Sequence, residues 1–199
     1  MELLTALGRV VPFAFASGIN LYATVAMLGL CARYDLVTLP TQYQAFAHPA
    51  VIAVALTLYL VEFVADKIPA VDSAWDAVHT VVRPAGGAFV AVTALGPASP
   101  AAAALAALVG ASVAMTTHLT KAGTRAAVNT SPEPFSNWTL SLSEDLFVVG
   151  LLYLAFQYPL AAFVVAVVLL VIAAAFMTVI VRAVRRRFRR PRGDARAVR

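Results

Sequence analysis

Long segments without a charged residue constrain the fold of this chain most strongly. The segment from Leu160 to Val181 contains no Asp, Glu, Lys or Arg and is rich in Ala, Val and Leu. A helix of about 20 apolar residues crosses a hydrocarbon core roughly 30 Å thick. Because 61% of the residues are hydrophobic and 13% are charged, the composition is that of an integral membrane protein. The apolar segments show no alternating pattern, which favours helical spans.

These segments predict an all-α integral membrane protein with about six transmembrane helices in a single domain, residues 1–181. The expected spans are residues 10–32, 49–64, 85–95, 101–120, 146–157 and 160–181. Between the second and third spans, residues 71–82 predict a cytoplasmic amphipathic helix bounded by Pro69 and Pro84. The third and fifth spans are too short to cross unaided. Each either takes in polar residues from its cytoplasmic side or is re-entrant.

Arginine dominates the last segment of the chain, residues 182–199. Nine of the 15 Lys and Arg residues lie there: Arg182, Arg185, Arg186, Arg187, Arg189, Arg190, Arg192, Arg196 and Arg199. Beside a span, such a tail marks the cytoplasmic side and contacts anionic lipid headgroups, an interpretation that we favour over nucleic-acid binding. Six crossings place the N-terminus on the same side. We therefore expect a multi-pass protein of the cell (inner) membrane with both termini in the cytoplasm.

Charged residues concentrate between two apolar segments, in the stretch from Glu62 to Arg83. Four of them are spaced as on one helical face: Asp72, Asp76, His79 and Arg83. Glu62 and Asp66 are four residues apart on the preceding helix. One interpretation is a helix at the cytoplasmic interface with its charges in solvent. The other is a proton or cation relay, because carboxylates bind hard cations and histidine changes charge near neutral pH.

A second polar face lies at the end of a later span. Its residues share one helical face and are His118, Lys121, Arg125 and Asn129. The cations favour an anionic partner such as phosphate or a lipid headgroup, although snorkelling side chains produce the same pattern. A third possibility is that this face lies against the acidic one and neutralises it. The polar segment that follows ends in Glu144 and Asp145, which either line the same site or belong to an ordinary loop.

The first span contains a polar interruption, Ser17-Gly18-Ile19-Asn20. Gly and Asn lower the stability of a membrane helix and often mark a break or a close contact. An amide side chain in an apolar helix requires a partner, and we favour a place for Asn20 in a polar cavity over simple helix packing. Broken helices are a feature of transporter binding sites.

The sequence carries no recognisable catalytic or metal-binding motif. A nucleophile elbow, an HExxH pair and a phosphate-binding glycine loop are all absent. Cys31 is the only cysteine and the three histidines are scattered, which argues against a zinc site. We therefore expect no cofactor.

Three segments of the chain form recognisable blocks. They are A-S-G-I-N-L-Y-A-T-V at 16–25, V-E-F-V-A-D-K-I-P-A-V-D-S-A-W-D-A-V-H-T-V-V-R-P at 61–84 and K-A-G-T-R-A-A-V-N-T-S-P-E-P-F-S-N at 121–137. These blocks resemble a bacterial membrane family catalogued as domain of unknown function 4126. The resemblance covers about residues 8–180. It implies a small multi-span membrane protein and brings no substrate or reaction.

The favoured function is a small secondary transporter or channel-like permease for an ion or a small charged solute, with proton coupling as an option. Its polar site would lie in the cytoplasmic half, where carboxylates and His79 handle protons or a cation. Lys121 and Arg125 would hold an anionic substrate or neutralise the carboxylates. One alternative is a membrane enzyme that acts on a lipid phosphate through His79 or His118. The other is a non-catalytic membrane scaffold with exposed, separate charged faces, and a homo-oligomer is compatible with each.

Overall fold

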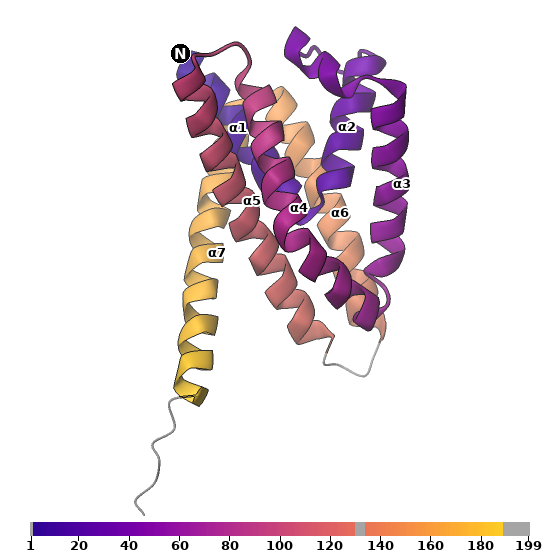
Figure 1. The fold of residues 1–199 in the computed structure, drawn as a ribbon, viewed down its shortest axis with the longest axis vertical. Helices are drawn as coiled ribbons and strands as arrows, with labels where there is room; N and C mark the ends of the chain where they lie inside the picture. The colour runs from indigo at the N-terminus through magenta and orange to yellow at the C-terminus, as the bar shows by residue number, and fades with distance from the viewer. Residues whose placement is uncertain (1, 130–133, 189–199) are drawn as a thin grey trace, which may run out of the picture.

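The computed structural model describes residues 2–129 and 134–188, which form helices joined by short connections (Figure 1). In chain order they are α1 (Glu2–Ile19), α2 (Leu21–Arg33), the 3-10 helix η1 (Thr41–Phe46), α3 (Pro49–Ala65), α4 (Pro69–Leu95), α5 (Pro100–Val128), α6 (Pro134–Gln157) and α7 (Pro159–Phe188). No strand occurs in the described part of the chain, so the all-α prediction is confirmed. The last five α-helices all begin at a proline, whose fixed φ suits the first helical position and whose missing N–H is not needed there.

Four of the described helices are long and apolar enough to cross a membrane. They are Pro69–Leu95, Pro100–Val128, Phe135–Gln157 and Pro159–Arg182. Three shorter apolar helices accompany them, Ala6–Ile19, Leu21–Arg33 and Pro49–Ala65. The prediction of a helical membrane protein is therefore confirmed, whereas the count of six crossings stays a prediction.

Helix α4 corrects one expected boundary. Residues 71–82 and 85–95 belong to the same helix, and Pro84 lies inside it. The separate amphipathic helix at 71–82 is therefore a wrong prediction. A proline removes only one helical hydrogen bond, and a helix that is packed against neighbours tolerates this loss. Helix α6 likewise extends residues 146–157 backwards to Pro134, so both short spans take in polar residues, as the first of the two alternatives expected.

The break expected in the first span is present and reverses the chain. Helix α1 ends at Ile19, Asn20 is extended with φ −146°, and α2 begins at Leu21. In Figure 1, α1 runs from the N-terminal end of the bundle to its middle, and α2 returns to the same end. A single crossing by residues 10–32 is therefore a wrong prediction. Because α1 and α2 do not form one crossing, the N-terminal end of α1 and the C-terminal end of α7 lie at opposite ends of the bundle (Figure 1). The prediction that both termini lie on the same side of the membrane does not agree with this arrangement. Which side each end faces is not shown by the structure.

The apolar core surrounds α1 in the half of the bundle nearer the N-terminus. Phe13 is fully buried and contacts Tyr43 of η1 and Phe156 of α6 edge to face, with ring centroids 6.0 and 5.4 Å apart. Leu28 and Leu152 are also fully buried in this cluster. Aromatic pairs in this geometry stabilise a core beyond the area that they bury. The polar residues singled out in the sequence lie beyond this core, from the end of α1 onwards.

We expect Gly18→Ala to destabilise the protein by about 1–3 kcal/mol, because overpacking a well-packed site costs this much. A Cβ at Gly18 would collide with the Thr117 hydroxyl and the Ala114 carbonyl of α5. Gly150 in α6 is the matched control, since among the described residues nothing beyond its chain neighbours and the nearby backbone of α6 lies within 4 Å of its added Cβ. Gly150→Ala should be neutral or stabilising, because alanine is the better helix former. Unfolding followed by circular dichroism in detergent measures both variants, and equal effects would show that α1 and α5 are not in close contact.

Candidate functional site

The centre of the site is an ion-pair group that is closed off from solvent. Glu62, near the end of α3, accepts hydrogen bonds at Oε1 from Arg83 Nη2 at 2.6 Å and from Lys121 Nζ at 3.1 Å. Glu62 and Arg83 are fully buried, and Lys121 is 5% exposed. A buried charge is tolerated only when it is paired and hydrogen-bonded. The acidic face of α4 and the cationic face of α5 also lie against each other, because Asp72 contacts Asn129 and Arg125, and Arg83 contacts His118. This is the third of the possibilities left open by the sequence.

Arg125 joins three helices around a second pair of carboxylates. Its Nη2 donates to Asp66 Oδ2 at 2.7 Å and to Glu144 Oε2 at 2.6 Å. Its Nη1 donates to the Asp66 carbonyl at 2.8 Å, and its Nε to Glu144 Oε2 at 3.2 Å. A planar guanidinium with five donors suits this forked arrangement better than an ammonium group does. Arg125 therefore fixes the end of α3 and the middle of α6 relative to α5.

The break between α1 and α2 provides further partners for these cations. The last carbonyls of a helix have no partner within it and carry partial negative charge. Arg83 Nη1 binds the Gly18 carbonyl at 3.3 Å, and Lys121 Nζ binds the Ile19 carbonyl at 3.1 Å. The end of α1 is thus satisfied by side chains from α4 and α5.

Asn20 connects the same break to α6. Its Oδ1 accepts from the Ala23 amide at 2.9 Å and caps the start of α2. Its Nδ2 donates to Asp145 Oδ1 at 3.0 Å, and the Tyr59 hydroxyl donates to Asp145 Oδ2 at 3.2 Å. Asn20 is 1% exposed, so both hydrogen bonds lie inside the protein. The role in a polar site expected for Asn20 agrees with these partners.

The two histidines of the network are held in defined tautomers. Arg83 Nη1, which can only donate, lies 2.9 Å from His118 Nδ1, so this nitrogen accepts. His118 is therefore neutral, with its proton on Nε2, which lies 3.1 Å from the Thr80 hydroxyl. His79 Nδ1 lies 2.7 Å from the Trp75 carbonyl and must donate to it. The other ring nitrogen, His79 Nε2, lies 2.9 Å from the Tyr22 hydroxyl.

Two carboxylates on the outer part of α4 have weaker partners. Asp76 Oδ1 lies 3.6 Å from Arg83 Nη1, and Asp72 Oδ1 lies 3.9 Å from Arg125 Nη1. Neither oxygen accepts a hydrogen bond from the described residues. Asp72 Oδ2 accepts from Asn129 Nδ2 at 2.7 Å. Both carboxylates are buried, 1% exposed for Asp72 and 6% for Asp76.

The network holds more acids than bases. Three carboxylates form short ion pairs with the three buried cations: Glu62, Asp66 and Glu144 with Arg83, Lys121 and Arg125. Three others have no cation that close: Asp72, Asp76 and Asp145. Lys67 lies at the edge, where its Nζ donates to the Phe63 carbonyl at 2.7 Å. Burial lowers the pKa of Lys67, and the charge of Asp66 opposes this shift. Even with Lys67 counted as a cation, the carboxylates exceed the cations by two.

The structure brings together every residue that the sequence marked for the site. These residues are Asn20, Glu62, Asp66, Asp72, Asp76, His79, Arg83, His118, Lys121, Arg125, Asn129, Glu144 and Asp145. Nine of them are buried as whole residues on α3, α4 and α5 or just after α3: Glu62, Asp66, Asp72, Asp76, His79, Arg83, His118, Lys121 and Arg125. The solvated interface helix and the exposed scaffold faces, which the sequence left open, do not agree with this burial.

Sequence reasoning missed the hydroxyl groups that complete the network. Tyr22 and Tyr59 were treated as part of apolar spans, and Thr80 was not singled out. A signal was available for two of them. Tyr59 precedes Glu62 by one helical turn, and Thr80 precedes Arg83 by the same spacing, so each shares a face with a charged residue.

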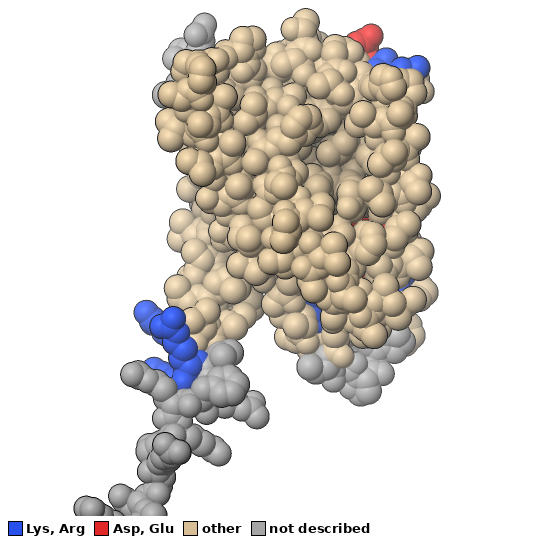
Figure 2. All heavy atoms as spheres, in the orientation of Figure 1, with Lys and Arg blue, Asp and Glu red and all other residues tan. Residues whose placement is uncertain are grey.

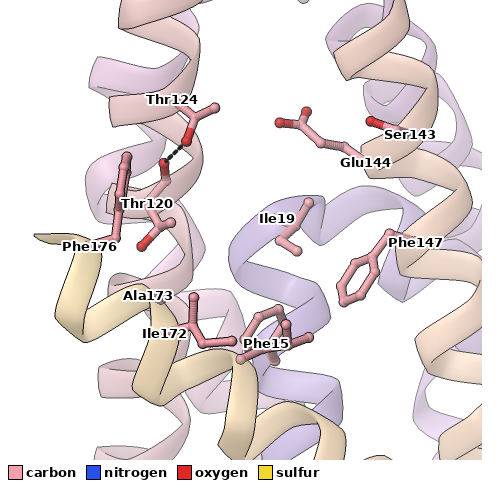
Figure 3. A pocket seen from close by; sticks show the side chains of 11 residues that line it. Phe15, Ile19, Thr120, Thr124, Ser143, Glu144, Phe147, Ile172, Ala173 and Phe176 are labelled. Atoms are coloured by element: carbon pink, nitrogen blue, oxygen red, sulfur yellow. Dashed lines mark hydrogen bonds between the residues drawn. The ribbon is translucent and has the colours of Figure 1, made fainter.

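Two cavities reach the network from outside. One, of about 200 Å³, lies between α4 and α5 and is lined by Asp72, Ser73, Asp76, Ala77, Thr80, Ala122, Arg125, Ala126 and Asn129. The other, of about 550 Å³, has walls from α1, α5, α6 and α7 and is mainly apolar (Figure 3). In Figure 3 the Glu144 carboxylate points from α6 across this cavity towards Thr124 of α5, above a wall that includes Phe15 and Phe147.

The outer surface contrasts with this interior. In the view of Figure 2, apart from the residues drawn in grey, charged side chains gather at the end of α7 and at the opposite end of the bundle, and the surface between them is almost free of them. Among residues 2–129 and 134–188, no group of three or more His, Cys, Asp and Glu side chains is placed to hold a metal ion. Between these two ends, the charged side chains of the described residues thus lie mainly inside the helical bundle.

Comparison with known proteins gives a family without an assigned activity. No curated protein and no solved structure matches the chain. One family model matches residues 7–179, which is most of the sequence. The chain therefore belongs to the family described as Domain of unknown function (DUF4126).

Proposed function

We propose that this protein is a small membrane permease that moves protons or a small cation through the buried network. The observation that carries the proposal is the surplus of carboxylates. A network that served only to hold helices together would balance its charges, because an uncompensated buried carboxylate is costly. Asp72 and Asp76 have their nearest guanidinium nitrogens at 3.9 and 3.6 Å, and Asp145 accepts hydrogen bonds from the neutral Asn20 and Tyr59 side chains. The two surplus negative charges of the network therefore call for protons or a bound cation. Groups that must take up positive charge inside a membrane domain suit ion movement.

The broken helix supports the same proposal. Half-helices that meet inside a membrane domain expose backbone groups and dipole ends to a bound ion or to charged side chains. Here the end of α1 meets Arg83 and Lys121, and Asp145 lies beside the start of α2. In this proposal α1 and α2 form a re-entrant hairpin, and the network lies near the level where they meet.

The exposed arginines of α7 suggest the orientation. Arg182, Arg185 and Arg186 lie at the end of α7 that is away from the N-terminus. Cytoplasmic flanks of spans are rich in Lys and Arg, which also contact anionic headgroups. We place this end in the cytoplasm of a cell membrane and the N-terminal end on the other side. The rest of the tail, residues 189–199, lies outside the described residues.

A flux experiment tests the proposal. Purified protein in vesicles with a trapped pH dye should dissipate an imposed proton gradient, or carry Na⁺ or K⁺ down a gradient, faster than empty vesicles. Glu62→Gln should reduce this flux by about tenfold or more, equivalent to ~1.4 kcal/mol. The amide keeps an oxygen for the bonds from Arg83 and Lys121, and its NH₂ takes the place of Oε2, which has no partner. The variant therefore changes the charge with little change in shape.

Asp35→Asn is the matched control for this flux. Asp35 is exposed and lies in the connection between α2 and η1, away from the network. Its amide variant should retain the wild-type flux. Wild-type protein without flux of any of these ions, or a Glu62→Gln variant with full flux, contradicts the proposal.

A second function, an enzyme acting on a lipid phosphate, is favoured by the cavity in Figure 3. Its apolar walls would accept a lipid chain, and Glu144 at its polar end is bonded to Arg125. Arginine is well suited to holding phosphate. Turnover of a radiolabelled phospholipid by the purified protein would identify this activity. Ion flux without turnover would exclude it.

A further inference from the structure

The cavity between α4 and α5 lies where these helices separate. Nearer their other ends they are in close contact, because a Cβ on Gly110 would lie 2.6 Å from the Gly87 carbonyl oxygen. Small residues permit such a close approach of membrane helices. Towards Asp72 and Asn129, small side chains such as Ala77 leave an open space of about 200 Å³. Polar side chains of Asp72, Asp76 and Asn129 and small apolar side chains line this space together.

Three side-chain oxygens on residues that line this cavity lack a hydrogen-bond partner among the described residues, and all three are acceptors. Asp72 Oδ1, Asp76 Oδ1 and Asn129 Oδ1 have no hydrogen-bond partner among the described residues. The bond from Asn129 Nδ2 to Asp72 Oδ2 at 2.7 Å fixes the amide so that its oxygen is the free atom. Asp72 and Asp76 are more than nine-tenths buried, so solvent does not satisfy these oxygens directly.

Most donors around the cavity are already used. The Arg125 guanidinium makes four hydrogen bonds to Asp66 and Glu144, and its remaining N–H is on Nη1, which lies 3.9 Å from Asp72 Oδ1. The Ser73 hydroxyl donates to the Pro69 carbonyl, and the Thr80 hydroxyl donates to the Asp76 carbonyl. A cavity whose lining residues hold unpartnered acceptors and two carboxylates attracts a positively charged guest.

The volume of the cavity and the side chains that line it indicate which kind of cation fits. Liquid water occupies about 30 Å³ per molecule, so the cavity holds a small ion with several waters. No cluster of three His, Cys, Asp and Glu side chains suited to a metal ion occurs among the described residues, which disfavours a dehydrated divalent or transition metal. Two carboxylates, an amide oxygen and water suit a monovalent cation.

We propose that this cavity is a binding site for a small monovalent cation, held by Asp72, Asp76 and Asn129. This inference rests on the proposed function and specifies the class of cation that the proposed permease binds. A cation bound here would compete with Arg83 for Asp76 and with Arg125 for Asp72, two long ion pairs at 3.6 and 3.9 Å. Arg83 and Arg125 also hold Glu62 and Asp66, so occupancy of the cavity is connected to the buried centre.

Cation binding by the whole purified protein in detergent tests the inference. NaCl, KCl and methylammonium chloride are titrated separately at constant ionic strength, with N-methylglucamine chloride as the balancing salt. The unfolding temperature should rise saturably with at least one of the three cations, and the comparison identifies alkali ion or ammonium. An unfolding temperature that stays the same when each of the three cations replaces N-methylglucamine overturns the inference.

Variants then locate the site. Asp72→Asn keeps an oxygen for Asn129 but replaces the free Oδ1 with an NH₂ donor, and should weaken binding by about tenfold or more. Ala77→Leu reduces the cavity without changing charge and should also weaken binding, whereas Ala74→Leu, exposed on the same helix outside the cavity, should not. Unchanged affinity in both cavity variants overturns the inference, even if one of them is less stable.

The flux assay separates this result from the proposed function. Saturable binding that depends on Asp72, together with no ion flux in vesicles, supports the cation site and contradicts the permease. Ion flux that persists at the wild-type rate in Asp72→Asn and Ala77→Leu, without cation-dependent stabilisation, supports the permease and overturns the cation site.

Discussion

Arg83→Met should cause the largest loss of stability of any single replacement in the network, about 3–5 kcal/mol. Arg83 and Glu62 are both fully buried and 2.6 Å apart, so the variant leaves a buried carboxylate with one of its two cations. The Gly18 carbonyl and His118 Nδ1 would also lose their donor. Unfolding by SDS, followed by circular dichroism, measures the change in the free energy of unfolding. Arg33→Met is the control, because Arg33 is exposed, and it should change stability by less than ~0.5 kcal/mol.

A double variant distinguishes loss of the ion pair from loss of packing. In Arg83→Met with Glu62→Met, the carboxylate that the single variant leaves with one cation is removed, whereas Asp76 loses its 3.6 Å contact with Arg83 in both variants. Lys121 keeps Asp66 Oδ2 at 3.4 Å and the Ile19 carbonyl at 3.1 Å. A buried ion pair is often replaced by apolar residues at little cost, so we expect a coupling of about 2 kcal/mol between the two sites. Additive losses would mean that Arg83 stabilises the bundle through its shape. If Arg83→Met does not fold at all, the double variant still gives a result, because recovery of folded protein requires the same coupling.

The polar faces of the helices could be predicted from sequence, because helical spacing places side chains on a common face. The spacing of Asp72, Asp76, His79 and Arg83 indicated one such face, and all four residues are buried rather than solvated. The choice of partners could not be predicted. Asn20 and Asp145 are 125 positions apart, and nothing in either local sequence indicates which helices come together. That information lies in the tertiary packing.

The direction of the chain after the break between α1 and α2 could not be predicted from the sequence either. Gly18 and Asn20 indicate an interruption, but a broken span can continue or reverse. The carbonyls at the end of α1 are satisfied by Arg83 and Lys121, residues of two distant helices, and the reversal depends on these contacts. At Pro84 the prediction was wrong in the other direction, because a helix end was expected and the helix continues. Its local preference for a helix end is real, yet α4 continues through it because its polar face is buried among ion pairs.

Asn20→Asp should destabilise the protein by about 2–3 kcal/mol although it preserves the helix cap. Aspartate caps a helix as well as asparagine does, so the bond from the Ala23 amide is retained. The new carboxylate, however, would lie where Nδ2 now donates to Asp145 Oδ1 at 3.0 Å, and two buried carboxylates would repel each other. Asn20→Ser provides the comparison, because it keeps a capping oxygen and introduces no charge. It should cost about 1 kcal/mol.

Exchanging the two residues should restore stability. With Asn20→Asp and Asp145→Asn together, the amide at position 145 donates to the carboxylate at position 20 and still accepts from the Tyr59 hydroxyl through its oxygen. The number of charges in the network is unchanged, and only the position of one carboxylate moves from α6 to the break between α1 and α2. Restored unfolding free energy with lost ion flux would show that the fold needs the hydrogen bond and that transport needs the carboxylate on α6. Failure of the exchange to recover stability would contradict the direct contact between Asn20 and Asp145, and with it the fixed junction of the two half-helices on which the permease proposal depends.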